Sequence, residues 1–305
     1  MPSRATFLPP PPIEADISTI TIGYNVRDLT IRNMETLLES EGDVKIQIIL
    51  VDNVSQDGTA EAIVERFPEV HVIKNHYNTG FAHAVNQGIA ASRARHVLLL
   101  NPDMRVTKEA MAKMVAYADA HPEVGVIGGK LMTEDGRLVP HVRRFPDVWS
   151  QLAVILKLPH VFPNVLARYM QEDLDPDKEQ DVDSVRGSFF LITQEALKRF
   201  GCLDPRYYIF FEEVDFCRQV VEKGMKVRYV PSITAIDYVG RSFKQKTRYW
   251  SQKQFTKSMI QYFEKWQPKW QSYLLRLARP LGLSSLWLVD RWRELRAKSV
   301  LKPLP

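Results

Sequence analysis

The sequence predicts an α/β fold in which a mostly parallel sheet is flanked by helices. Short apolar runs alternate five times with stretches of helical periodicity between residues 18 and 131, an order typical of parallel strands joined by helices. The apolar run Leu98-Leu99-Leu100 ends abruptly in Asn101-Pro102-Asp103, where the proline prevents the strand from continuing. No repeat of about 20–50 residues is visible, which argues against a solenoid or a propeller.

The first half of the chain carries strand and helix signals in regular order. β-branched residues alternate in the first run, Thr59 and Thr107 are typical of helix starts, and Pro68 ends a helix. The strands are predicted over residues 18–24, 45–51, 70–74, 95–100 and 124–131, and the helices over 28–40, 59–67, 79–92 and 107–120.

The second half is less regular. Asp135-Gly136 indicates a turn within a hairpin, and Gly201 and Gly224 each end a short helical stretch. Residues 150–180 lack a clear period and finish in an acid-rich stretch, 172–183, which we interpret as a loop or lid. The remaining elements are predicted as strands over 185–193, 226–230 and 233–237, helices over 195–200 and 213–223, and a helical region beyond residue 242.

Size and composition are those of a globular protein. The chain has 305 residues, of which 45% are hydrophobic, and no window reaches the ~20 apolar residues that a membrane-spanning helix needs. Cys202 and Cys217 lack metal-binding spacing, so we expect free thiols in a reducing cytoplasm. We expect a proline-rich, flexible leader over 1–16 and a folded domain over 17–242.

The C-terminal tail, residues 243–305, has a distinct composition. From Arg241 onward the chain carries 15 Lys/Arg against 3 acids, and five of its six tryptophans. Leu288, Trp292 and Leu295 fall on one helical face, with Val289 beside them. Such a basic amphipathic helix is typical of contact with an anionic membrane surface, although it could also simply pack on the catalytic domain. A third alternative is a non-enzymatic protein that binds nucleic acid through this tail, but it leaves the ordered acids of the domain without a role.

Polar residues follow several predicted strands at the point where each strand ends. In open α/β sheets, ligands bind at this carboxyl edge. A carboxylate after the second strand can accept hydrogen bonds from a base or a ribose, and Asp103 can hold a hard cation that in turn binds phosphate oxygens. The residues expected at this edge are Tyr24, Asn25, Asp52, Asn53, Asn78, Gly80, Asn101 and Asp103.

The order of these pieces resembles family 2 glycosyltransferases, which have the GT-A fold. The matching motifs include Val51-Asp52-Asn53, Asn78-Thr79-Gly80, Leu99-Leu100-Asn101-Pro102-Asp103, Gly187-Ser188-Phe189-Phe190 and Phe211-Glu212-Glu213-Val214-Asp215. The resemblance covers about residues 18–242. It implies a catalytic domain over 17–242, with a nucleotide-binding half at 17–131 and an acceptor half at 132–242. The Asn-Pro-Asp form and the acidic run make it most similar to bacterial rhamnosyltransferases of cell-surface polysaccharide synthesis.

The resemblance implies a role for individual residues. Asp52 would contact the nucleotide, and Asp103 would bind Mg²⁺ or Mn²⁺ in the family's Asp-x-Asp motif, of which Asn101 takes the first position. Gly187 would let the backbone approach the donor. Glu213 would be the catalytic base, with Asp215 in reserve.

One position departs from the family pattern. Asp237 stands where a late histidine is expected. Either Asp237 binds the divalent ion through a hard oxygen ligand, or it does not, and Arg241, Lys244 or Arg248 neutralises the diphosphate instead.

These roles together predict an inverting, metal-dependent glycosyltransferase. A cation stabilises the leaving diphosphate, and a carboxylate takes the proton of the acceptor hydroxyl. We expect transfer of rhamnose from dTDP-rhamnose to a lipid-linked or growing surface glycan, in the cytoplasm and at the inner face of the plasma membrane, without nucleic acid. A UDP-hexose or UDP-N-acetylhexosamine donor is the alternative. The sequence leaves the oligomeric state open.

Overall fold

The computed structural model describes residues 13–238 and 247–300, with the backbone alone for 285–300. A nine-stranded sheet forms its centre, in the order β3-β2-β1-β4-β10-β6-β11-β5, and β8 pairs with β11 beside this path. The predicted α/β class is therefore confirmed. The strands of the sheet are β1 (Ala15–Gly23), β2 (Ile46–Asp52), β3 (His71–Lys74), β4 (Ala94–Leu100), β5 (Met104–Val106), β6 (Val124–Met132), β8 (Gln180–Asp181), β10 (Phe189–Ile192) and β11 (Lys226–Asp237).

Strands β1 to β4 pair in parallel, whereas β10 runs antiparallel between β4 and β6. Side chains of β4 alternate between two cores: Leu98 and Leu100 face one, and Val97 and Leu99 face the other. Both faces are apolar because helices cover both, as parallel strands require. The helices of the first core are α1 (Arg27–Leu38), α2 (Thr59–Arg66) and α4 (Ala110–Ala120), and those of the second are α3 (Phe81–Ala91), α6 (Gln194–Phe200) and α7 (Glu212–Glu222).

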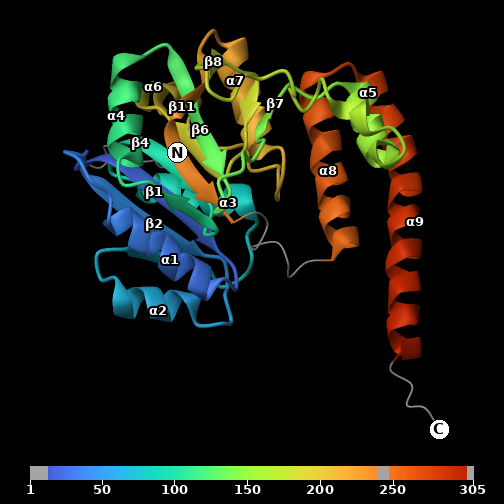
Figure 1. Cartoon of the computed structure of the whole chain (residues 1–305), viewed down its shortest axis with the longest axis horizontal. Coiled ribbons are helices and arrows are strands. Elements are labelled where there is room, and N and C mark those ends of the chain that lie inside the picture. Colours follow the sequence, from blue (N-terminus) through green and yellow to red (C-terminus); the bar gives the residue numbers. More distant parts are fainter. Residues whose placement is uncertain (1–12, 239–246, 301–305) are drawn as a thin grey trace, which may run out of the picture.

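A third apolar cluster holds the C-terminal helices. Helices α8 (Arg248–Trp266) and α9 (Lys269–Val300) lie side by side beyond the sheet, and α5 (Val148–Ile155) lies against α9 (Figure 1). Tyr207 and Phe211 of the segment before α7 pack into this cluster, so the described part of the tail shares a core with the predicted 17–242 domain. No helix within the described residues is both long and apolar enough to cross a bilayer.

Several predicted boundaries change. The first strand starts inside the predicted 1–16 leader: Ala15 belongs to β1, and Asp16 pairs with Arg95. The predicted strand 185–193 is two strands, β9 (Ser184–Val185) and β10, because the chain leaves the sheet at 186–188; β9 pairs with β7 (Val142–Arg143) in a small second sheet. Helix α5 and the short turns at Leu158–His160 and Pro163–Leu166 occupy a region where the sequence shows no clear period.

The acid-rich stretch 172–183 does not lie over the polar edge of the sheet. Asp181 accepts from the guanidinium of Arg228 at 2.6 Å, and the carbonyl of Pro176 accepts from the hydroxyl of Tyr229 at 3.0 Å. Both partners belong to the first half of β11, nine and eight residues before Asp237. The stretch is therefore held against β11, and the lid interpretation stays a prediction.

Candidate functional site

A cleft of about 300 Å³ opens at the carboxyl ends of β1, β4 and β11. Side chains from both halves of the chain line it, including the first turn of α7 and the start of α8. The site residues predicted from the sequence that line the cleft are Tyr24, Asn53, Asn78, Gly80, Asn101, Asp103, Gly187, Glu213 and Asp237. The lining also includes residues to which the sequence assigns no role in the site: Arg186, Ser188, Tyr208, Glu212 and Trp250.

The turn after β4 fixes Asp103 at the floor of the cleft. The amide of Met104 donates to the carbonyl of Asn101 at 3.1 Å, and the side chain of Asn33 donates to the carbonyl of Met104 at 2.8 Å. The amide of Asn101 also donates to the carbonyl of Ser188 at 3.0 Å. This turn, held from both sides, places Asp103 in the cleft although the residue is only 4% exposed.

Asp237 lies beside Asp103 because β11 and β5 are antiparallel neighbours. Asp237 is in register with Met104, and the amide of Tyr238 donates to the carbonyl of Asp103 at 3.1 Å. The carboxylate of Asp237 accepts from the guanidinium of Arg186, whose Nε donates to the hydroxyl of Ser188 at 3.1 Å. Asp103 and Asp237, the two predicted metal ligands, are thus neighbours, and Asp237 is already paired with the guanidinium of Arg186.

A divalent ion fits only part of this arrangement. Asp103 offers the hard oxygen that Mg²⁺ and Mn²⁺ prefer, whereas the charge of Asp237 is already balanced by Arg186. Among the described residues, no group of three or more His, Cys, Asp or Glu side chains could hold a metal ion. An ion bound here would therefore need ligands besides the side chains of the described residues. Arg241 and Lys244 lie outside the described residues.

Asp52 is the last residue of β2 and Asn25 lies in the loop after β1, and neither lines the cleft. The carboxylate of Asp52 is 3% exposed, and its Oδ2 accepts from the amide of Ser55 at 3.0 Å. Its Oδ1 is buried and has no hydrogen-bond partner in the described structure. The side chain of Asn25 accepts from the amide of Gln56 at 2.6 Å and joins the two loops.

A network of amides holds the loop before α3. The side chain of Asn53 donates to Asn78 at 3.1 Å, and the hydroxyl of Tyr208 donates to the same Asn78 oxygen at 2.8 Å. Gly80 has a φ of 86°, and a Cβ there would lie 2.6 Å from the carbonyl oxygen of Tyr208. Glycine is therefore required at this position both by conformation and by space.

Two glutamates open on the cleft from the first turn of α7. Phe210 and Phe211 precede them in the left-handed region, with φ of 69° and 70°, a strained conformation that is frequent at functional sites. One carboxylate oxygen of Glu212 and one of Glu213 lack a hydrogen-bond partner within the described chain. Gly187 lies against Glu213, because a Cβ at Gly187 would be 3.5 Å from that of Glu213.

Both carboxyl groups have a raised pKa. Removal from bulk water raises the pKa of Glu212 well above its ordinary value, and the nearby Glu213 raises it further. The pKa of Glu213 is also raised by its dry surroundings, but backbone N–H groups at the start of the helix and Arg186 oppose this rise. Glu213 is therefore the member of the pair that ionises more readily.

Asp215, the reserve base, is not in the cleft. Its carboxylate is fully buried and accepts from the ammonium group of Lys265 at 2.7 Å and from the indole of Trp266 at 2.6 Å. The hydroxyl of Tyr207 and the side chain of Gln219 donate to it as well. This placement favours a structural role: helical periodicity turns Asp215 away from Glu213, and its contacts tie α7 to the end of α8.

Sequence reasoning missed Arg186 and Tyr208 for different reasons. Arg186 stands directly before Gly187 in a motif that was noticed, so its position was a usable signal. Tyr208 reaches Asn78 across 130 positions, and no local pattern encodes such a contact. Trp250, likewise, was counted only as part of the basic tail.

The sequence matches one protein-family model and several curated proteins. The family model described as Glycosyl transferase family 2 matches residues 18–201. The N-acetylglucosaminyl-diphospho-decaprenol L-rhamnosyltransferase of Mycobacterium tuberculosis is 30% identical over 210 residues, which is 65% of this chain and 68% of the relative. Rhamnosyltransferase WbbL of Escherichia coli is 25% identical over 182 residues, 56% of this chain and 66% of the relative.

Among solved structures, the mannosyltransferase PcManGT from Pyrobaculum calidifontis, in complex with GDP-Man and Mn²⁺, superposes with a TM-score of 0.56. It is 19% identical, and the match covers 96% of this chain and 79% of that one. At this identity the likeness concerns the fold, which is the GT-A fold predicted from the sequence.

Proposed function

The chain belongs to glycosyl transferase family 2 and is a glycosyltransferase, and on this premise we propose that it transfers a sugar from a nucleotide-sugar donor to a hydroxyl of a lipid-linked or growing surface glycan. The proposed donor is dTDP-rhamnose, since relatives in Mycobacterium tuberculosis and Escherichia coli are named rhamnosyltransferases. The observation that carries the proposal is that Asp103 and Glu213, 110 positions apart, open on one cleft.

The donor would lie across the carboxyl edge of the sheet. Contact of Asp52 with a base or a ribose hydroxyl, the role that the family resemblance implies, would require its buried Oδ1 to become exposed. The amide network around Asn53 and Asn78 keeps the neighbouring loops in place. The absence of a side chain at Gly187 leaves room beside Glu213 for the sugar. Mg²⁺ or Mn²⁺ bound at Asp103 would supply Lewis-acid stabilisation of the leaving diphosphate.

Glu213 is the proposed base. Its carboxylate would take the proton of the acceptor hydroxyl as that oxygen attacks the anomeric carbon and the bond to the diphosphate breaks. This single displacement inverts the anomeric centre. The raised pKa of Glu213 strengthens it as a base, because a catalytic base works best when its pKa approaches the working pH.

The variant Glu213→Gln tests this role. We expect transfer to fall by about 10²–10⁴-fold while the affinity for the nucleotide-sugar stays unchanged, since the substitution keeps the shape of the side chain. Glu222→Gln at the exposed end of the same helix is the matched control and should transfer normally. Near-normal transfer by Glu213→Gln would exclude Glu213 as the base.

The donor is identified by a separate measurement. A thermal-shift panel should show stabilisation by dTDP-rhamnose, since a ligand at 100 times its Kd stabilises a protein by about 2.7 kcal/mol. Selective stabilisation by a UDP-hexose or a UDP-N-acetylhexosamine would replace rhamnose in the proposal and leave the transferase chemistry intact.

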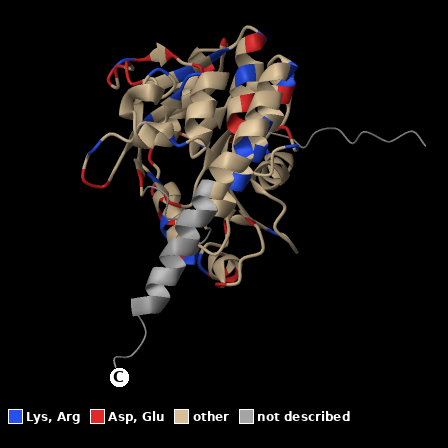
Figure 2. Ribbon diagram, turned by 90° about the vertical axis from the view of Figure 1, so that its right-hand side faces the viewer, with Lys and Arg blue, Asp and Glu red and all other residues tan. Residues whose placement is uncertain are grey.

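We also propose that the tail contacts the inner face of an anionic membrane. This contact would bring a lipid-linked acceptor to the cleft. Between Thr247 and Ser284 the chain carries seven Lys/Arg against the single acid Glu264. Figure 2 views the molecule from this side and shows basic residues along α9. Exposed apolar side chains at helical spacing form a stripe along α9 that consists of Trp270, Tyr273, Leu277 and Leu281.

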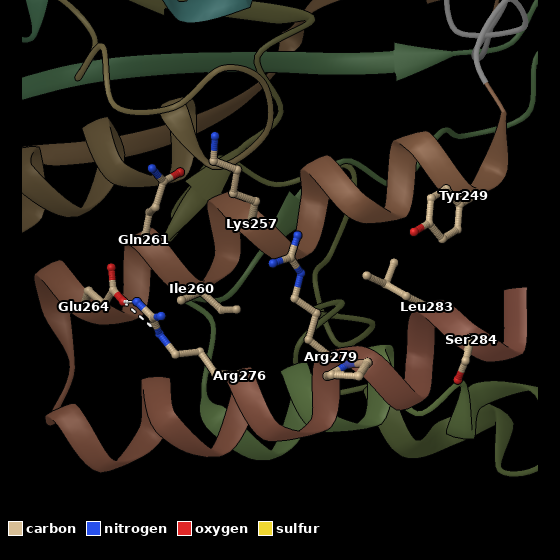
Figure 3. A pocket seen from close by; sticks show the side chains of 10 residues that line it. Tyr249, Lys257, Ile260, Gln261, Glu264, Arg276, Arg279, Leu283 and Ser284 are labelled. Carbon is tan, nitrogen blue, oxygen red and sulfur yellow. Dashed lines mark hydrogen bonds and ion pairs between the residues drawn. The ribbon is translucent and has the colours of Figure 1, made fainter. Parts of the chain in front are cut away.

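An open groove of about 830 Å³ runs between α8 and α9 beside this stripe. In Figure 3, Arg279 reaches from α9 towards α8 between Ile260 and Leu283, and Arg276 pairs with Glu264. Cations beside exposed aromatic and aliphatic groups are typical of interfacial helices. The apolar face predicted around Leu288 lies beyond the residues with described side chains.

Vesicle sedimentation tests the membrane contact. The protein should bind phosphatidylglycerol vesicles, release them at high salt and ignore phosphatidylcholine vesicles. Leu277→Asp, at a position 75% exposed, should weaken the binding without unfolding the protein. Equal binding by this variant would remove the described stripe of α9 from the contact.

A further inference from the structure

The most informative unassigned group in the cleft is the guanidinium of Arg186. Its Nη2 donates to the Oδ2 of Asp237, and its Nε donates to the hydroxyl of Ser188. The two partners differ in exposure: the side chain of Asp237 is 1% exposed and that of Arg186 is 40% exposed. The carboxylate is therefore the fixed, buried member of the pair, and the guanidinium faces the cleft.

Arg186 also has unused donors. Its Nη1 makes no hydrogen bond to any part of the chain that the structure describes, whereas Nη2 and Nε donate to Asp237 and Ser188. A guanidinium fixed in this way has little side-chain freedom left to lose when it binds a ligand. Planar guanidinium groups match the oxygens of phosphate better than any other side chain.

The surroundings place this cation where a diphosphate would lie. Arg186 precedes Gly187, and both residues line the same cleft as Asp103. The strand that ends in Asp237 is joined to Asp103 through the amide of Tyr238. Arg186 is also close enough to Glu213 to lower the pKa of that carboxyl group.

The same contacts argue against Asp237 as a metal ligand. Coordination of a divalent ion by Asp237 would either displace Arg186 from its buried partner or place two cations against one carboxylate. Removal of one partner from a buried ion pair is strongly unfavourable. Asp103 therefore remains as the aspartate that can bind the ion, whereas Asp237 pairs with Arg186.

From these observations we propose that Arg186 binds the diphosphate of the donor and that Asp237 is its positioning residue rather than a metal ligand. The inference rests on the proposed function and assigns separate roles to Arg186 and to the metal ion. Arg186 holds the diphosphate whether or not a metal is present. The ion at Asp103 is required for transfer.

The test is nucleotide binding in EDTA, measured by calorimetry with thymidine diphosphate and with thymidine. Wild-type protein should bind the diphosphate about 10–100-fold more tightly than thymidine, as expected for one charge-assisted contact. Arg186→Met should reduce the affinity for the diphosphate to that for thymidine and leave thymidine binding unchanged. Arg186→Lys should restore part of the difference. Arg105→Met removes a cation that lies over the Tyr238 ring, outside the cleft lining, and is the matched control.

Direct Mn²⁺ binding, followed by the electron spin resonance of the free ion, separates the two aspartates. Asp103→Asn should lose Mn²⁺ and keep diphosphate binding in EDTA, whereas Asp237→Asn should keep Mn²⁺ and bind the diphosphate less tightly. If Arg186→Met fails to fold because Asp237 is left buried and unpaired, the double variant Arg186→Met/Asp237→Asn removes both charges and should show the same loss of diphosphate affinity.

The outcomes distinguish this inference from the proposed function. Unchanged diphosphate affinity in Arg186→Met, or loss of Mn²⁺ in Asp237→Asn with normal binding in EDTA, would overturn the inference alone. Wild-type protein that binds no nucleoside diphosphate, with uridine diphosphate also tested and with Mn²⁺ present or absent, would instead overturn the proposed function.

Discussion

Replacement of Asp215 by alanine separates a structural carboxylate from a catalytic one. The side chain is 0% exposed and receives four hydrogen bonds, the shortest from Trp266 at 2.6 Å and Lys265 at 2.7 Å. Loss of one partner of a buried ion pair costs about 3–5 kcal/mol, because the remaining charge stays buried. The hydrogen bonds share one acceptor group, so their contributions do not simply add to this figure.

We therefore expect Asp215→Ala to lower the free energy of unfolding by about 4 kcal/mol, a large part of the roughly 5–15 kcal/mol typical of folded proteins. In urea, with a slope of about 1–3 kcal/mol/M, the midpoint should fall by more than about 1 M. Glu222→Ala on the same helix breaks only the exposed pair with Arg218 and should cost less than about 1 kcal/mol. The assay is urea unfolding followed by tryptophan fluorescence, because Trp266 is in direct contact with the altered side chain.

A different result would refute this reasoning. If Asp215→Ala unfolded at the same urea concentration as the wild type but had lost transfer, Asp215 would act in catalysis and the structural account would be wrong. If both stability and transfer were unchanged, Lys265 and Trp266 would have found other partners, and the burial argument would fail.

Three further predictions concern pH, backbone and metal. Removal from water raises the pKa of Glu213 above its ordinary value of 4.5, so this base stays protonated to a higher pH than an ordinary glutamate. The acidic limb of the pH–rate profile should therefore lie at a higher pH. An acidic limb at or below pH 4.5 would contradict the assignment. Gly80→Ala should destabilise the fold by more than about 1 kcal/mol, whereas Gly136→Ala, also at positive φ but with nothing within 4 Å, should cost less; equal midpoints in urea would show that contact with Tyr208 is unimportant. EDTA should abolish transfer, and Mn²⁺ or Mg²⁺ should restore it in the wild type but not in Asp103→Asn; transfer in EDTA would remove the metal from the mechanism.

Local signals in the sequence were reliable for the elements that build the sheet. The parallel strands and their helices have the predicted order, with boundaries displaced by a few residues, because apolar periodicity and capping residues act over short distances. The sheet edge at the carboxyl ends of β1, β2 and β4 therefore carries Tyr24, Asn53 and Asp103, as the sequence predicts. Asp215 was misplaced because the same acidic run contains residues on two helical faces, and only packing decides which face meets the cleft.

Long-range pairing was not accessible in the same way. The contact of Asp237 with Arg186 depends on the antiparallel pairing of β11 with β5 and on the chain leaving the sheet between β9 and β10. The acid-rich stretch 172–183 looked free because its partners, such as Arg228, are distant in sequence. Composition revealed that this stretch is polar but gave no information on what it binds.

By itself, then, the sequence determined the α/β class, the family and the acids that end two distant segments, since apolar periodicity and short motifs carry these properties locally. The tertiary structure alone decided that Glu213 rather than Asp215 faces the cleft, that Asp237 is neutralised by Arg186, and that Tyr208 and Trp250 line the cleft. The physical reason is that these outcomes depend on burial and on contacts between residues far apart in the chain, which exist only once the strands have paired and the helices have packed.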